Sequence, residues 1–388
     1  MNWFKKKQQQ TPTCLLTKHR RFLFDLHYLR HQNLLEPKKI IIMVVAYFVF
    51  SCAIVAIFIW NLSYSTIVDF YNSGTPRSVD LEISEILHLV FSLKFMEIDD
   101  FNTYVNLQST VWSSIAIILV GIALSVAGCI TQSLTKNPLA DPSTLGIVGA
   151  TVFMVVLAIS FDFRMYTQKI GFAFIGGGIA ALMLLGMVMM SKQKKSFLKM
   201  TLAGLATGVF FNTIAYFIRS TEESASSANM LYILGGPENI LKANGFPDFQ
   251  LLWICAVIII VGFIITMIIS HKLSLLDLGD EKAKNLGTSV IYVKLIAILA
   301  TILLIAPSIL LAGNVAFVGL FTPHIVRKLF GVRDFRAVIP LSAVFGAIIT
   351  SLGLLLTREV PSINSSIWMH FIGAPTLAYV GWVNWKNA

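Results

Sequence analysis

Ten runs of apolar residues, separated by short polar segments, account for most of the chain. A helix of about 20 apolar residues crosses the ~30 Å hydrocarbon core of a bilayer, and lipid offers backbone groups no partner outside a helix or a closed barrel. We therefore predict an all-α integral membrane protein with about ten transmembrane helices. The predicted spans are residues 40–60, 112–133, 144–161, 170–190, 199–218, 250–270, 291–311, 314–330, 337–357 and 366–384.

Composition supports a membrane location. Of the 388 residues, 56% are hydrophobic and only 13% are charged, whereas a soluble domain carries about 25% charged residues. The first apolar run begins at Ile40, after a basic and polar segment. That run is too long for a signal peptide, and no small-residue cleavage site follows it, so we expect a true first span.

The chain then divides into two parts. Residues 1–39 form a basic cytoplasmic segment, in which residues 20–35 mix basic and aromatic side chains. That stretch is interpreted either as an interfacial helix on the inner leaflet or as a disordered tail. Residues 40–388 form the polytopic membrane domain.

Charge gives the orientation of this domain. With the N-terminus in the cytoplasm, most of the 30 Lys and Arg residues fall in inside segments, and most of the 20 Asp and Glu residues fall outside. This is the positive-inside bias. We expect both termini in the cytoplasm of a bacterial cell, with lipid around the spans. The net charge of +10 thus reflects topology and does not indicate binding of nucleic acid.

Two long outside segments, residues 61–110 and 219–249, are acidic. They are interpreted either as docking surfaces for an extracellular partner or as solvated connections.

Several kinds of chemistry are missing from the sequence. It has no phosphate-binding GxxxxGK[ST] loop, no Cys/His spacing for a metal, and no nucleophile with a base. No Asp or Glu lies in the middle of a span, where an ion-coupled carrier would need one. We expect no catalytic residue, no bound cofactor and no metal site, so the chain is not an enzyme by itself.

Residues 121–150 contain a close-packing signal followed by a turn. Gly121 and Gly128 lie two turns apart and offer one helix face for tight contact. Pro138 and Pro142, four residues apart, stop the helix and predict a rigid inside turn. An ordinary helix hairpin explains the same spacing.

Residues 273–287 form the inside segment with helical periodicity. An apolar stripe and a charged face predict two short amphipathic helices, with Gly279 and Gly287 as breaks. A soluble partner could grip such a knob; a helix lying at the membrane interface is the simpler alternative. The stripe comprises Leu275, Leu276, Leu278, Ala283 and Leu286, and the charged face comprises Asp277, Asp280, Glu281, Lys282 and Lys284.

Two further segments contain prolines. Pro323 is expected to let the inner end of the eighth span kink, and His324 beside it is interpreted as a hydrogen-bonded structural residue in preference to a ligand. Gly373 and Pro375 are expected to interrupt the last span. His370 near the outer end suits packing or exposure at the interface better than substrate contact.

Taken together, these segments resemble the FecCD family of permeases, which serve bacterial importers of iron–siderophore complexes, haem and vitamin B12. The resemblance extends over residues 110–384, with the motifs in the family's order. The first motif matches at Gln132, Asn137, Pro138, Leu139, Ala140, Pro142, Leu145, Gly146, Gly149 and Ala150. The others match at Leu278, Gly279, Ala283, Leu286 and Gly287, at Phe317, Val318, Gly319, Leu320, Pro323, His324 and Arg327, and at Gly373, Ala374 and Pro375.

The resemblance implies a bundle like that of the vitamin B12 importer permease, a type II ABC importer. It implies a second permease subunit, identical or homologous, two cytoplasmic ATPase subunits that use ATP and Mg, and an extracellular substrate-binding protein. The implied cargo is siderophore-bound iron, with haem and cobalamin as alternatives. The implied ATPase-coupling surface consists of Leu278, Gly279, Asp280, Glu281, Ala283, Lys284, Leu286 and Gly287.

The resemblance has departures. The arginine-rich segment expected before the second span is replaced by residues 107–114, which contain no arginine. Arg358 matches another family arginine and is expected to contact the binding protein. The segment before the last span also differs, and the outside segment 61–110 is longer than usual. A stand-alone secondary transporter remains the alternative function.

Overall fold

The computed structural model describes residues 37–72, 101–163, 165–190, 196–221, 232–236, 248–360, 363 and 365–386. The predictions for residues 1–36, and for most of the two acidic outside segments, lie outside these residues. Within the described part the secondary structure is helical throughout. The prediction of an all-α protein is confirmed.

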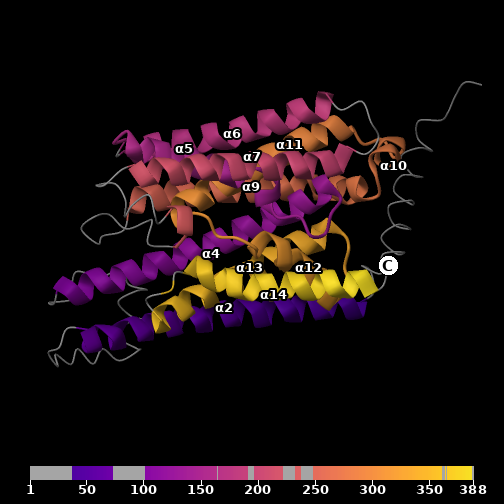
Figure 1. Cartoon of the computed structure of the whole chain (residues 1–388). Helices are drawn as coiled ribbons and strands as arrows, with labels where there is room; N and C mark the ends of the chain where they lie inside the picture. The colour runs from indigo at the N-terminus through magenta and orange to yellow at the C-terminus, as the bar shows by residue number, and fades with distance from the viewer. Residues whose placement is uncertain are drawn as a thin grey trace, which may run out of the picture.

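Each predicted span corresponds to one helix of a single elongated bundle (Figure 1). The helices are α2 (Pro37–Asn72), α4 (Phe101–Thr135), α5 (Ile147–Ser160), α6 (Tyr166–Met190), α7 (Ser196–Thr221), α9 (Phe249–Asp277), α10 (Asp280–Asn285), α11 (Val290–Ala312), α12 (Val318–Phe330), α13 (Phe335–Glu359) and α14 (Ser365–Lys386), with a 3-10 turn η2 (Pro142–Leu145) before α5.

Not every helix is long enough to cross a membrane. Among the described residues, seven helices have the necessary length and apolar composition, and these are α2, α4, α6, α7, α9, α11 and α13. Helices α5 and α12 have 14 and 13 residues, which corresponds to roughly 20 Å each. Two predicted spans are therefore shorter than expected. Gly146, with φ of 75°, separates η2 from α5, and a non-helical segment, 313–317, precedes α12.

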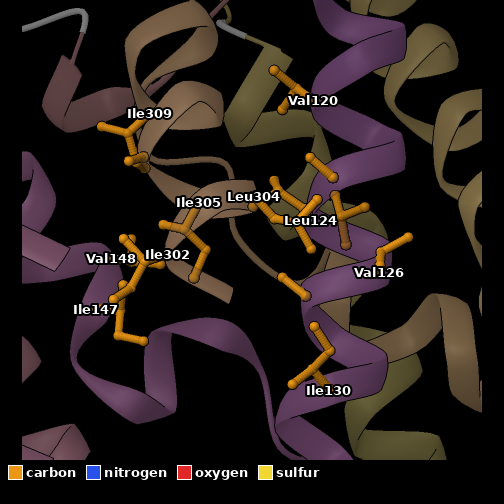
Figure 2. Packing of buried hydrophobic residues seen from close by; sticks show 14 of the residues in the cluster. Val120, Leu124, Val126, Ile130, Ile147, Val148, Ile302, Leu304, Ile305 and Ile309 are labelled. Carbon is orange, nitrogen blue, oxygen red and sulfur yellow. The ribbon is translucent and has the colours of Figure 1, made fainter. Parts of the chain in front are cut away.

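Helix α4 lies at the centre of the bundle. It contacts α2, α9, α11, α12 and α13, and it is buried over most of its length. Figure 2 shows part of this core, where Leu124 of α4 lies beside Leu304 of α11, and Ile302 and Ile305 of α11 approach the start of α5. Because lipid is as apolar as these side chains, close packing rather than exclusion of water must hold such helices together.

The two glycines predicted to form a packing face of α4 do so. A Cβ on Gly121 would lie 2.5 Å from the carbonyl oxygen of Gly346 in α13, and one on Gly128 would lie 2.5 Å from the carbonyl carbon of Gly319 in α12. Real Cβ atoms do not come so close to backbone. The prediction of a tight face on α4 is confirmed, and its partners are α12 and α13.

The short helix α10 marks one end of the bundle, called here the α10 end. Helix α14 finishes at this end, and α4 and α2 extend furthest at the other, called here the opposite end (Figure 1). The connection from α11 runs back along the bundle before α12 begins.

Candidate functional site

The turn after α4 is stabilised by side-chain hydrogen bonds, and the rigidity expected from its two prolines stays a prediction. The Asn137 side-chain oxygen accepts a hydrogen bond from the Leu139 backbone at 3.0 Å. The Asp141 carboxylate accepts from the backbone and the hydroxyl of Ser143, at 3.0 and 2.8 Å, and so caps η2. Burial raises the pKa of the Asp141 carboxyl, against the lowering effect of the bonds from Ser143. Pro142 begins η2, where its missing N–H costs nothing.

Gln132 joins α4 to α12 through three hydrogen bonds. Its side-chain nitrogen donates to the carbonyl oxygens of Leu320 at 3.0 Å and Gly319 at 3.5 Å. Its side-chain oxygen accepts from Arg327 at 2.5 Å. The guanidinium of Arg327 also lies 5.1 Å from the ring centre of Phe335, a cation–π contact.

Pro323 explains why Gln132 is needed there. A proline inside a helix has no N–H for the carbonyl four residues earlier, and here that carbonyl belongs to Gly319. Gln132, whose side chain is buried, supplies the missing donor from the neighbouring helix. The structure thus joins Gln132 of one motif to Gly319 and Arg327 of another, which the resemblance had left apart in the sequence. Pro323 lies inside α12, which continues to Phe330, and the kink stays a prediction.

His324 differs from its interpretation. The side chain of His324 is half-buried, and its ring forms no hydrogen bond with any residue that the structure describes. The expected hydrogen-bonded role is therefore not found in this part of the chain.

The segment 273–287 forms one short helix where two were predicted. Helix α9 continues to Asp277, so the first half of the segment belongs to α9, and only α10 is separate. Gly279 has φ of 111° and Gly287 has φ of 82°, so both expected breaks are confirmed. The predicted apolar stripe is divided. Leu276 and Ala283 are buried, whereas Leu278 and Leu286 are 42% and 49% exposed.

Asp280, the first residue of α10, binds two lysines. Its carboxylate lies 2.8 Å from the Lys136 nitrogen, just after α4, and 2.6 Å from the Lys294 nitrogen, in the first turns of α11. Burial alone would raise the pKa of this carboxyl, but the hydrogen bonds and charges of the two ammonium groups hold it below its usual value. Three segments therefore meet at one carboxylate.

A second polar joint at the α10 end links α9 to α13. The Ser274 hydroxyl lies 3.0 Å from the Asp334 carboxylate and accepts from the Phe335 backbone at 2.9 Å. Asp334 also caps α13 through the Arg336 backbone, and binds the Arg336 guanidinium at 2.9 Å. Sequence reasoning missed this joint, although an Asp just before an apolar helix is a recognisable N-cap signal.

At the opposite end, Arg358 ties three helices together. Its guanidinium donates to the backbone oxygen of Asn61 in α2 at 2.6 Å and of Thr110 in α4 at 3.5 Å. Arg358 was expected to contact an extracellular binding protein. The observed bonds show that it also has a structural role, and the docking role stays a prediction.

The start of α14 packs against the segment before α12. A Cβ on Gly373 would lie 2.5 Å from the Cβ of Phe317, and the His370 ring contacts the Phe317 ring with a centroid distance of 5.3 Å. A ring nitrogen of His370 pairs with the Ser366 carbonyl at 2.7 Å. His370 is exposed and makes these two contacts, which agrees with the preferred interpretation of packing or interface exposure. Gly373 and Pro375 do not interrupt the helix, which runs from Ser365 to Lys386.

A short turn that sequence reasoning had placed in an outside loop also reaches this region. The backbone of Gly236 donates to Ala312 at 2.8 Å, and the backbone of Asn314 donates to Tyr232 at 3.1 Å. The Ser366 hydroxyl then donates to Asn314 at 2.9 Å. The non-helical segment before α12 is therefore bonded on both sides.

Comparison with known proteins identifies relatives. The model of the FecCD transport family matches residues 66–382. The iron(3+)-hydroxamate import system permease protein FhuB of Bacillus subtilis is 36% identical over 243 residues, which are 62% of this chain and 61% of that protein. The Fe(3+)-citrate import system permease protein YfmD of the same organism is 32% identical over 270 residues, 68% of this chain and 77% of that protein.

A solved structure supports the fold. The chain superposes on a transporter assigned to the metal-chelate type of ABC transporter, in an inward-facing conformation, with a TM-score of 0.67 and 20% identity, covering 88% of this chain and 99% of that one. At this identity the likeness concerns the fold alone. Since the family model matches most of the sequence in the order of its motifs, the chain belongs to the FecCD transport family.

Proposed function

We propose that this protein is the membrane-spanning permease subunit of an ATP-binding-cassette importer that moves an iron chelate into the cytoplasm. Separate ATPase subunits would supply the energy, with ATP and Mg bound by those subunits. The observation that carries this proposal is α10, a six-residue helix bounded by two glycine turns at one end of the bundle.

The surface of α10 has the composition of a binding site for a soluble protein. Leu278 and Leu286 stay about half exposed on either side of the helix. Glu281, Lys282 and Lys284 are exposed between them. A protein partner that covers this surface would bury the two leucines, and covering a leucine fully gives up to about 1.5–3 kcal/mol.

Charge supports a cytoplasmic position for this surface. The α10 end carries Lys136, Arg327, Lys328, Arg333 and Arg336, and short loops rich in Lys and Arg face the cytoplasm. ATPase subunits would then meet α10 from the cytoplasm, and a substrate-binding protein would dock at the opposite end.

The cargo is proposed from the relatives. FhuB and YfmD are named for the import of iron(3+) hydroxamate and iron(3+) citrate, and a further relative, IsdF of Staphylococcus aureus, is named for haem-iron transport. We favour a siderophore-bound iron(3+) complex, with haem and cobalamin as alternatives. A second permease subunit would complete the path, and the helices proposed to line it are near residues 144–160, 199–218 and 366–380.

Reconstitution tests the proposal. The chain is placed in liposomes with its ATPase subunits, its partner permease if one is required, and a binding protein loaded with an iron(3+) hydroxamate. Uptake is expected to require ATP at the ATPase subunits and to be independent of proton and sodium gradients. A stand-alone secondary transporter would take up the chelate without the ATPase when an ion gradient is imposed, and that result would overturn the proposal.

A variant locates the contact with the ATPase. Replacing Leu278 and Leu286 together by Ser should weaken capture of the ATPase subunits at least tenfold. Leu329 of α12, which is 63% exposed, provides a matched control, because Leu329→Ser removes an exposed leucine outside α10. Equal weakening by both variants would contradict a specific role of α10.

A further inference from the structure

The helix α10 has few fixed attachments to the bundle. A Cβ placed on Gly279 or on Gly287 would have no atom within 4 Å, so nothing packs against the chain at either boundary of α10. Its described packing is against α9 and α11, through the buried side chain of Ala283. A six-residue helix held in this way can change its angle without disturbing a tightly packed neighbour.

One side chain of α10 reaches beyond this packing. The Asp280 carboxylate binds Lys136 with one oxygen and Lys294 with the other, at 2.8 and 2.6 Å. Lys136 follows the last turn of α4, whereas Lys294 lies near the start of α11. The carboxylate therefore connects the end of α4 with the start of α11.

These two helices lead to the rest of the bundle. Helix α4 is the central helix and contacts α12 and α13 through glycine crossings, and Lys136 begins the turn that leads to α5. Helix α11 contacts α4, α5, α6 and α9. A displacement of α10 that pulls on Asp280 is applied to both helices at once.

The charges make this arrangement specific. Two ammonium groups share one carboxylate, so without Asp280 they would face each other with like charge. The side chains of Lys136, Asp280 and Lys294 are 27%, 42% and 26% exposed, so the cluster is only partly accessible to water and to screening salt. An uncharged side chain at position 280 removes the attraction on both sides.

We propose that Asp280 is the positioning residue that makes α10 move together with α4 and α11, so that motion of an attached ATPase is converted into motion of the membrane helices. This inference rests on the proposed function. In it, Leu278 and Leu286 bind the ATPase, whereas Asp280 transmits the displacement and does not contribute to ATPase affinity.

The test separates binding from transmission. Asp280→Asn is introduced into the complete transporter, and three quantities are measured: ATPase capture, ATP hydrolysis, and chelate carried per ATP hydrolysed. ATPase capture should be unchanged, whereas chelate carried per ATP should fall about fivefold or more, the lower limit of typical coupling effects. Asp162→Asn is the matched control, since it makes the same substitution at an exposed aspartate that follows α5 and lies outside the α10 surface, and it should leave the ratio unchanged.

A double-mutant cycle shows whether Asp280 acts on α4 and α11 through Lys136 and Lys294. In the wild-type background, Lys136→Gln and Lys294→Gln should each lower the amount of chelate carried per ATP. In the Asp280→Asn background they should have little further effect, because the effects of substitutions within one ion-pair network are not additive. Asp280→Glu should restore part of the coupling. If Asp280→Asn does not accumulate in the membrane, the two lysine variants replace it in the same measurement.

The outcomes are distinguishable. A normal ratio in Asp280→Asn, an equal loss in Asp162→Asn, additive effects in the cycle, or loss of ATPase capture in Asp280→Asn would each overturn the inference while leaving the proposed function intact. Uptake by the wild-type protein that does not depend on ATP would overturn the proposed function, and the inference with it.

Discussion

Glycine is used for opposite reasons in α4 and around α10. Gly121 and Gly128 have ordinary helical backbone but no space, since a Cβ on either would overlap backbone atoms of another helix. Gly279 and Gly287 have open space but positive φ, which side chains disfavour. The first pair brings backbones into contact and fixes the centre. The second pair lets the chain turn and leaves α10 loosely attached, so substitution should affect stability at the first and coupling at the second.

The largest expected effect is at the central crossing. In Gly128→Ala the new methyl group would meet the backbone of Gly319, which cannot rotate away, and overpacking of this kind costs about 1–3 kcal/mol or more. We expect a marked drop in the thermal unfolding temperature in detergent and in the amount of folded protein. Gly178 of α6, with no atom within 4 Å of its Cβ position, is the control, and Gly178→Ala should not destabilise. Equal stability of the two variants would contradict the distinction.

A somewhat smaller loss of stability is expected from substitution of Gln132, which forms hydrogen bonds across the same contact between α4 and α12. Gln132→Met keeps the length of the side chain but leaves the Gly319 carbonyl without a donor and Arg327 without its acceptor. A buried polar group that loses its partner costs about 1–3 kcal/mol. Gln132→Glu keeps an acceptor for Arg327 and lacks the donor, so it should destabilise less. Unfolding temperatures that do not differ among the three proteins would show that the carbonyl needs no cap.

At the boundary of α10 the effect on stability should be smaller and the effect on function larger. Gly279 has φ of 111° and ψ of 147°, a conformation that costs a residue with a side chain about 1–3 kcal/mol. Because nothing packs there, the chain can relax locally, and Gly279→Ala should lower the unfolding temperature less than Gly128→Ala does. Transport per ATP should nevertheless fall. A greater loss of stability than in Gly128→Ala would overturn the comparison.

The smallest effect concerns pH. The pKa of Asp280 is lowered in the folded protein by its two lysines, so its contribution to stability is complete above the unfolded value of about 3.9 and is lost as pH falls through the lower folded value. The unfolding temperatures of wild type and Asp280→Asn should keep a constant difference from pH 7 to about 5 and converge below about pH 4. A difference that already shrinks between pH 7 and 5 would contradict this assignment.

The sequence predicted the fold more completely than it predicted the site. Apolar runs located every long helix, since length and hydropathy decide a span, and Gly121 and Gly128 were correctly read as a packing face. The pattern could not show that α9 continues to Asp277 or that α14 passes through Pro375, because packing in a bundle compensates for local breaks. The contacts of Gln132, Asp280 and Arg358 join segments far apart in the chain, and no local pattern indicates such partners.

The non-helical segment before α12 has a consequence for biosynthesis. A membrane tolerates such backbone only where protein or water covers its polar groups, and here Tyr232 and Ser366 provide bonds on two sides. Ser366 belongs to α14, which leaves the ribosome after α12. Until that helix arrives, the Asn314 carbonyl lacks one of its partners, and we expect a nascent chain stalled before residue 365 to be a substrate for membrane quality control.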